Sequence, residues 1–246
     1  EAVLRTVARM TEGDMRRALN ALETLIAGHA LHTPLTLEEV AAFAGERHLR
    51  YDRGEDEHYD TASAFIKSIR GSDPDAAMYW LAVMLEGGED PRFIMRRLVI
   101  LASEDVGLAD SRAITVATAA QQACDFLGLP ECALTLAHCV LFLATCPKSN
   151  SATMALAAAQ SAVKTGARQS VPMHLRDAHT KVNKALGQGA GYLYSHEFPE
   201  GISGQTYLSS PLKLYTAGNT GAEAAIAERL AHWDELRAAL RAQRKA

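Results

Sequence analysis

The chain lacks the phosphate-binding loop of P-loop nucleotide hydrolases. No G-x-x-x-x-G-K-[ST] string occurs, and glycine is nowhere followed by lysine. Aromatic residues make up only 6% of the 246 residues, and no uncharged apolar run approaches the ~18 residues that a membrane-spanning helix needs. We therefore expect no ATP hydrolysis by this chain alone and no association with a membrane.

Cysteine is also scarce, and its spacing does not suit a metal site. Three of the four cysteines, Cys132, Cys139 and Cys146, are seven residues apart, whereas zinc sites use closer pairs such as C-x-x-C. His174 and His179 are five apart, which does not match the i, i+4 pairing of helical zinc ligands. We expect no metal, and we expect buried, reduced thiols in a helical core, as in a cytoplasmic protein.

The net charge of −4 provides no overall positive field for nucleic acid, so any DNA contact must come from a local patch. The most basic window is opposed only by one aspartate; its cations are Lys164, Arg168, Arg176, Lys181 and Lys184. This window could bind DNA phosphates or could be solvated surface. Tyr192, Tyr194 and Tyr207, in a glycine-rich stretch, could stack on bases or anchor that stretch by packing.

Abundant alanine and apolar residues at helical spacing predict an all-α protein. Asp73-Pro74 and Asp90-Pro91 are typical helix starts, and Thr36 with Glu39 forms a capping box. The predicted helices cover 2–10, 14–27, 37–43, 56–70, 74–86, 91–106, 110–126, 130–146, 151–165 and 223–244. Residues 45–57 are predicted to be a linker, and the glycine- and tyrosine-rich segment after Leu186 to be irregular, with room for one short strand pair.

Two further features have both a structural and a functional interpretation. The alanine-rich face of Met154, Ala158 and Ala162 suits close packing, either within the chain or between subunits. Glu104 and Asp105 are adjacent carboxylates without a nucleophile or histidine cluster nearby. We expect them to pair with Arg96, Arg97 or Arg112, and we assign no catalytic residue.

The segment Gly13–Asn20 joins a turn to an amphipathic helix. Asp14 can cap that helix, while Arg16 and Arg17 lie away from its apolar face. The planar guanidinium of arginine suits phosphate, although a capped surface helix with solvated arginines would have the same sequence. The string resembles the sensor 2 segment in the helical lid of clamp-loader-type AAA+ ATPases. The resemblance implies that Arg16, the first arginine after Gly-Asp-x, approaches the γ-phosphate of ATP bound by a preceding domain, with Arg17 beside it.

Longer strings carry a more specific resemblance, which spans nearly the whole chain. They are His58–Ala77, Tyr79–Leu81, Gly88–Ile94, Arg96–Leu98, Ser103–Gly107, Pro147–Asn150, Pro172–Ala178 and Tyr192–His196. Together they resemble the C-terminal half of the replication-associated recombination protein A family, also called MgsA, whose eukaryotic relative is the Werner helicase-interacting protein. The match departs at Ser209-Ser210-Pro211, where the family tends to place proline directly after the Gln-x-Tyr-Leu segment, and Leu212–Gly221 is loosely matched.

The resemblance implies a function for a larger parent protein, and the chain, which opens on Glu1, is expected to be a piece of it. The parent would be a DNA-dependent AAA+ ATPase, using ATP and Mg²⁺, in replication-fork maintenance, recombination and repair. It would be cytoplasmic and nucleoid-associated, with single-stranded DNA-binding protein as a plausible partner. Residues 1–50 would be the lid remnant, 51–72 a connecting helix, and 73–246 a helical domain that assembles a homotetramer.

Two alternative functions remain open at the level of the sequence. One is the collar-type oligomerisation region of a clamp-loader subunit, which would share Gly13–Asn20 but not the His58–Ala77 or Pro147–Asn150 strings. The other is an unrelated helical adaptor that binds protein partners and stays monomeric.

Overall fold

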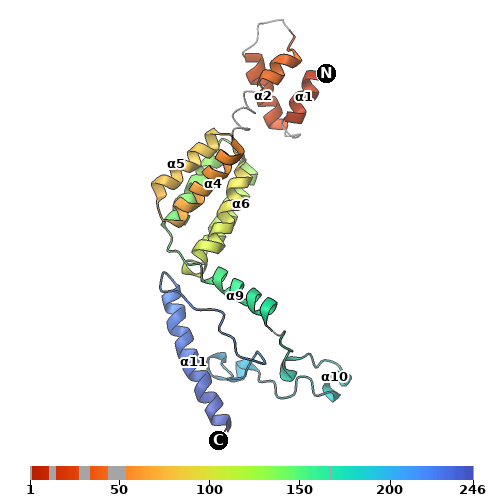
Figure 1. The fold of residues 1–246 in the computed structure, drawn as a ribbon, viewed down its shortest axis with the longest axis vertical. Helices are drawn as coiled ribbons and strands as arrows, with labels where there is room; N and C mark the ends of the chain where they lie inside the picture. Colours follow the sequence, from red (N-terminus) through yellow and green to blue (C-terminus); the bar gives the residue numbers. More distant parts are fainter. Residues whose placement is uncertain (1, 11–14, 28–33, 44–53, 167, 246) are drawn as a thin grey trace.

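The computed structural model describes residues 2–10, 15–27, 34–43, 54–166 and 168–245. The described ranges contain helices and no strand, so the predicted all-α class is confirmed. The longer helices are α1 (Ala2–Met10), α2 (Met15–Ala27), α4 (Gly54–Arg70), α5 (Pro74–Glu86), α6 (Pro91–Leu101), α7 (Arg112–Leu127), α8 (Cys132–Thr145), α9 (Ser151–Thr165) and α11 (Glu223–Lys245). They follow one another along an elongated molecule, from the N-terminal helices through a bundle to the C-terminal region (Figure 1).

The N-terminal helices form a small unit with its own apolar cluster. Val7 of α1, Ala21 and Leu25 of α2, and Val40 of the helix over 37–43 are buried together. Thr36 caps the last of these helices as predicted, because its hydroxyl accepts from the Glu39 N–H and its own N–H donates to the Glu39 carboxylate. Residues 45–53 of the predicted linker lie outside the described residues, whereas 54–57 belong to α4 rather than to a linker.

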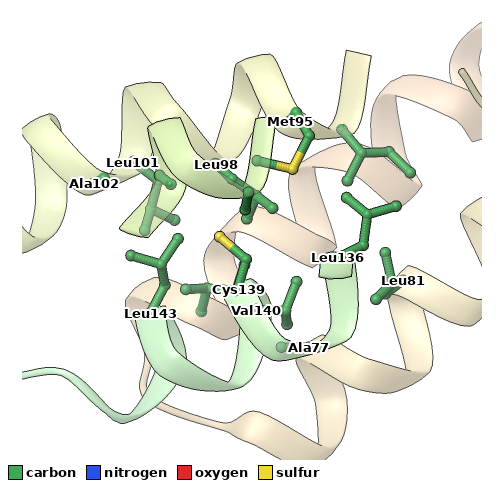
Figure 2. Packing of buried hydrophobic residues seen from close by; sticks show 14 of the residues in the cluster. Ala77, Leu81, Met95, Leu98, Leu101, Ala102, Leu136, Cys139, Val140 and Leu143 are labelled. Atoms are coloured by element: carbon green, nitrogen blue, oxygen red, sulfur yellow. The ribbon is translucent and has the colours of Figure 1, made fainter. Parts of the chain in front are cut away.

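Helices α4 to α8 form a bundle around one continuous apolar core (Figure 2). Asp73 and Asp90 cap α5 and α6 by accepting the N–H groups of Ala76 and Arg92, each over 2.9 Å, with a proline at the first helical position. The helices of the bundle bury residues that recur at helical spacing, and these include Phe65, Ile69, Leu81, Ile94, Met95, Leu98, Leu101, Leu136 and Leu143. All four cysteines are free and buried, as expected, and burial raises the pKa of Cys139 to about 12.

A π-helix, Ala102–Val106, continues α6 and ends at Gly107, whose φ of 50° suits glycine. It turns the buried carboxylate of Asp105 toward α4, where the Arg70 Nε donates to Asp105 Oδ1 over 2.6 Å. The expected partners of Glu104 and Asp105 were therefore wrong: Arg70 pairs with both, and Arg112 pairs with Asp110 instead. The expectation failed because Arg70, which is distant in the sequence, is brought next to these carboxylates by the packing of α4.

The C-terminal region, residues 147–245, is held differently from the bundle. Helix α9 has no buried residue, and the segment that follows consists of loops, 3-10 turns and the short helix α10 (Lys181–Ala185). The described part of the glycine-rich segment is irregular, as predicted, and contains no strand pair. Long helix α11 then begins next to the bundle and runs away from it toward the C-terminus (Figure 1), with Ile226, Leu230, Trp233, Leu236 and Leu240 half-buried on one face.

Buried Glu223, in the first turn of α11, fastens this helix to the start of α9. Its carboxylate accepts hydrogen bonds from the hydroxyls of Ser149, Ser151 and Tyr215. Burial alone would raise the pKa of Glu223, but the hydrogen bonds from the two serines, Tyr215 and the Gly218 N–H lower it below its usual value. This carboxylate is therefore ionised in the fold, and we call the cluster of Glu223, Ser149, Ser151 and Tyr215 the Glu223 latch.

None of the helices in the described ranges combines the length and apolar character needed to cross a bilayer.

Candidate functional site

The predicted nucleotide-contacting arginines lie at the start of α2, but only the helix itself can be described there. Gly13 and Asp14 lie outside the described residues, and the side chains of Arg16 and Arg17 do too. Helix α2 is packed through Ala21 and Leu25, which are buried in one apolar cluster with Val7 of α1 and Val40 of the helix over 37–43. The backbone at positions 16 and 17 therefore belongs to a helix that is anchored by these buried side chains.

The predicted basic window is divided by the structure. Lys164 lies in the last turn of α9, and Arg168 and Lys181 lie outside the concave surface described next. Arg176 and Lys184, in contrast, come together at one pocket of about 740 Å³ near α10. Two of the five predicted cations are therefore brought to one site.

This pocket, which we call the basic pocket, combines cations with aromatic rings. Arg176 and Lys184 line it together with His174, His179, Tyr192 and Tyr207. Its volume falls within the roughly 300–1,000 Å³ of ordinary ligand sites. Sequence reasoning noted each of these side chains in its own stretch but did not place them together. Arg176 and Tyr207 are distant in sequence, and no helical period relates them.

Hydrogen bonds to the backbone hold the walls of the basic pocket in place. The Arg176 Nε donates to the Val171 carbonyl over 2.9 Å, so this bond uses the Nε and not the two terminal nitrogens of the guanidinium. The His174 Nε2 lies 2.9 Å from the Thr206 carbonyl, a contact that requires a proton on Nε2. Because Thr206 precedes Tyr207, this bond joins two walls that are far apart in the chain.

A tight turn forms the remaining wall. Gly189 has a φ of 73°, and its N–H donates to the Met173 carbonyl over 3.0 Å. A Cβ on Gly189 would lie 2.7 Å from the Cβ of Ala178, closer than side chains approach. Glycine is therefore required here by both the backbone conformation and the space, and it lets the Tyr192 turn lie close to the 172–179 segment.

The electrostatics of the basic pocket favour an anion. Asp177 is the one carboxylate on its lining, and it pairs with the Nδ1 of His179. That hydrogen bond lowers the pKa of Asp177, so the carboxylate is ionised and compensated by its neighbour. Arg176 and Lys184 then add two positive charges without a partner carboxylate among the lining residues. A ligand that carries both an anionic group and a flat ring could pair with the cations and stack on the tyrosine rings.

The tyrosines are more exposed than packing anchors would be. Tyr192 is 48% exposed and Tyr207 is 55% exposed, with the Tyr207 hydroxyl 3.3 Å from the Ser195 Oγ. Hydrogen bonds from Ser195, Gln205 and Ser203 lower the pKa of Tyr207. Tyr194 is also 55% exposed but lies outside the pocket lining, where its ring contacts His196.

No group of three or more histidine, cysteine, aspartate or glutamate side chains in the described ranges could hold a metal ion.

Comparison with known proteins connects the chain to one family. A family model described as MgsA AAA+ ATPase C terminal matches residues 71–234, and a model described as AAA C-terminal domain matches residues 1–70. The chain is 48% identical to an uncharacterized AAA domain-containing protein of Mycobacterium tuberculosis, over 97% of this chain and 53% of that protein.

Two further relatives are also covered only in part. The replication-associated recombination protein A of Escherichia coli is 39% identical, over 92% of this chain and 53% of that protein. The ATPase WRNIP1 of Dictyostelium discoideum is 37% identical, over 87% of this chain and 27% of that protein. The chain spans about half the length of these two bacterial relatives.

Proposed function

We propose that this chain, which belongs to the MgsA family of AAA+ ATPases, supplies the lid and the assembly domain of a DNA-dependent ATPase. The full-length protein would bind ATP and Mg²⁺ through a domain that precedes the lid. It would act at stalled or damaged replication forks, in the cytoplasm, and single-stranded DNA-binding protein would be a partner. Family membership favours this function over a clamp-loader collar and over an unrelated adaptor.

The observation that carries the assembly role is helix α9. Met154 and Leu156 are each 60% exposed, and Val163 is 70% exposed. Met154 and Leu156 are two residues apart, which is about 200° around a helix, so apolar side chains point outward on opposite faces. Apolar side chains that are exposed on two faces of one helix are typical of a surface that a partner covers. We infer that other copies of the chain cover α9 in a closed assembly, and that this assembly is the homotetramer that the family resemblance implies.

Light scattering tests this assembly. The chain is expected to have about four times the mass of a monomer, and Leu156→Lys is expected to lower that mass because it places a charge in the subunit contact. Leu186→Lys, at a 63% exposed position outside α9, is the control and should leave the mass unchanged. A monomer at micromolar concentration would remove the assembly role from the proposal.

The lid role rests on Arg16 and is tested in the full-length protein. A guanidinium directed at the γ-phosphate stabilises the charge that develops during phosphoryl transfer. Arg16→Ala is expected to lower kcat for ATP hydrolysis by roughly 10²-fold without changing the assembly state. Arg17→Ala should do less, because it points about 100° further round the helix. The opposite ranking would overturn the assignment of Arg16, and no effect from either variant would overturn the sensor 2 role of this segment.

A further inference from the structure

The basic pocket has three properties that define its ligand more closely than a positive patch would. Cations and exposed aromatic rings line it together, its volume of about 740 Å³ is sufficient for a small ligand, and its walls are fixed by hydrogen bonds. A phosphate satisfies the cations, and a flat base satisfies an exposed tyrosine ring. A nucleotide unit is the common biological group that carries both.

We propose that the basic pocket binds one nucleotide of single-stranded DNA, with a phosphate at Arg176 and Lys184 and the adjoining base stacked on Tyr192. The proposal rests on the DNA dependence proposed above and adds the site and the strand form. Duplex DNA does not fit this arrangement, because its bases are already stacked on one another. A single strand offers free base faces.

The walls of the basic pocket are already ordered without a ligand, which favours binding of a flexible strand. His174 is tied to the Thr206 carbonyl, and Gly189 is tied to the Met173 carbonyl. The two tyrosine-bearing segments are thereby fixed to the 172–179 segment before any ligand arrives. Little ordering of the protein is then needed on binding, which preserves the affinity gained from the contacts.

Asp177 sets a condition on this binding. Its carboxylate would repel a phosphate, and its hydrogen bond from His179 offsets that repulsion. The other charged side chains on the lining are Arg176 and Lys184, and His174 is the remaining titratable group besides the two tyrosines. Removing the carboxylate should therefore strengthen binding of the strand: Asp177→Asn is expected to lower Kd.

Fluorescence anisotropy of the chain with a fluorescein-labelled oligothymidylate tests the site. Tyr192→Leu is expected to raise Kd about 10-fold, whereas Tyr192→Phe, which keeps the ring, should bind like the original chain. Lys184→Gln should weaken binding and reduce the slope of log Kd against log salt by about 1. The matched controls are Tyr194→Leu, a nearby exposed tyrosine outside the lining, and Lys67→Gln, an exposed lysine on α4.

An oligonucleotide that lacks bases separates stacking from charge. It should bind the original chain and Tyr192→Leu equally, and Lys184→Gln less well. Equal weakening by Tyr194→Leu, or duplex binding that depends on Tyr192 as strongly as single-strand binding does, would overturn the proposal.

The full-length protein separates failure of the pocket from failure of the function. If DNA stimulates ATP hydrolysis there while Tyr192→Leu and Lys184→Gln bind DNA normally, the basic pocket is not the site and the proposed function stands. If DNA neither stimulates hydrolysis nor binds the chain, both proposals fall.

Discussion

Helices α8 and α9 are close in length and both rich in alanine and other apolar residues, yet the molecule uses them in opposite ways. Helix α8 buries six residues, Cys132, Leu136, Cys139, Val140, Leu143 and Ala144, whereas α9 buries none. The same contrast holds between the bundle and the C-terminal region around these helices. The bundle is held by apolar packing, and the C-terminal region by polar contacts such as the Glu223 latch. Apolar composition alone therefore does not determine whether a helix is buried within its own chain.

The largest expected effect is on the bundle. Leu136→Ala removes a side chain that is 0% exposed, so the free energy of unfolding should fall by about 2–5 kcal/mol through lost burial and the cavity left behind. Leu134→Ala, two residues away on the same helix and 79% exposed, should change it by less than ~0.5 kcal/mol. Urea unfolding followed by circular dichroism measures both. Similar losses from the two variants would mean that α8 is not packed as described.

A smaller and more local effect is expected at the Glu223 latch. Glu223→Gln places an amide donor against hydroxyl donors, so the attachment of α11 should weaken by about 1–3 kcal/mol. Hydrogen exchange should become faster in α11, while the amides of α4 to α8 keep their protection. Loss of protection throughout the bundle would contradict the separation of the two regions.

Acid should act on the same latch without a mutation. The pKa of Glu223 is lower in the fold than in the unfolded chain, so the carboxylate contributes stability at a pH above its unfolded pKa of about 4.3. That stability is lost as the pH falls through the lower, folded pKa. Hydrogen exchange of α11 should therefore rise on acidification more steeply than that of the bundle, and Glu223→Gln should abolish this difference.

The smallest expected effect is at the surface of α11. His232 and Trp233 both donate to the Glu200 carboxylate, over 2.7 and 3.1 Å, and the hydrogen bond to Glu200 raises the pKa of His232. The contact therefore contributes fully below the unfolded histidine pKa and is lost as the pH rises through the folded one. A histidine titration by NMR should give a pKa above 6.5 for His232, and Glu200→Gln should lower it. Global stability should hardly change, because the pair is exposed.

The local parts of this fold could be predicted from the sequence. Local sequence patterns indicate the helix caps at Asp73 and Asp90. The helical spacing of the cysteines likewise indicates the buried face of α8. The Arg70–Asp105 pair could not be predicted, because it depends on a π-helix that no local pattern announces. Glu223 was equally hidden, since an acidic residue in the first turn of a helix normally faces solvent.

The candidate site was predictable only in its parts. The basic window and the tyrosines were visible in the sequence, and two of the five predicted cations line the basic pocket with two of the three tyrosines. Their meeting depends on long-range hydrogen bonds such as that from His174 to Thr206, which spacing does not encode. The roles of Arg16 and Arg17 and the domain boundaries at 50 and 72 stay predictions.

The place where α11 docks also bears on how the chain folds as it is made. The Ala222 N–H donates to the Ala109 carbonyl, and Glu223 binds Ser149 and Ser151, so the latch closes only after a long stretch of later chain has been synthesised. The bundle, in contrast, is contiguous and rich in local contacts, which favours rapid folding on the ribosome. During translation the bundle should therefore fold first. Helix α9 should then emerge with its apolar side chains uncovered, and α11 should attach last through the Glu223 latch.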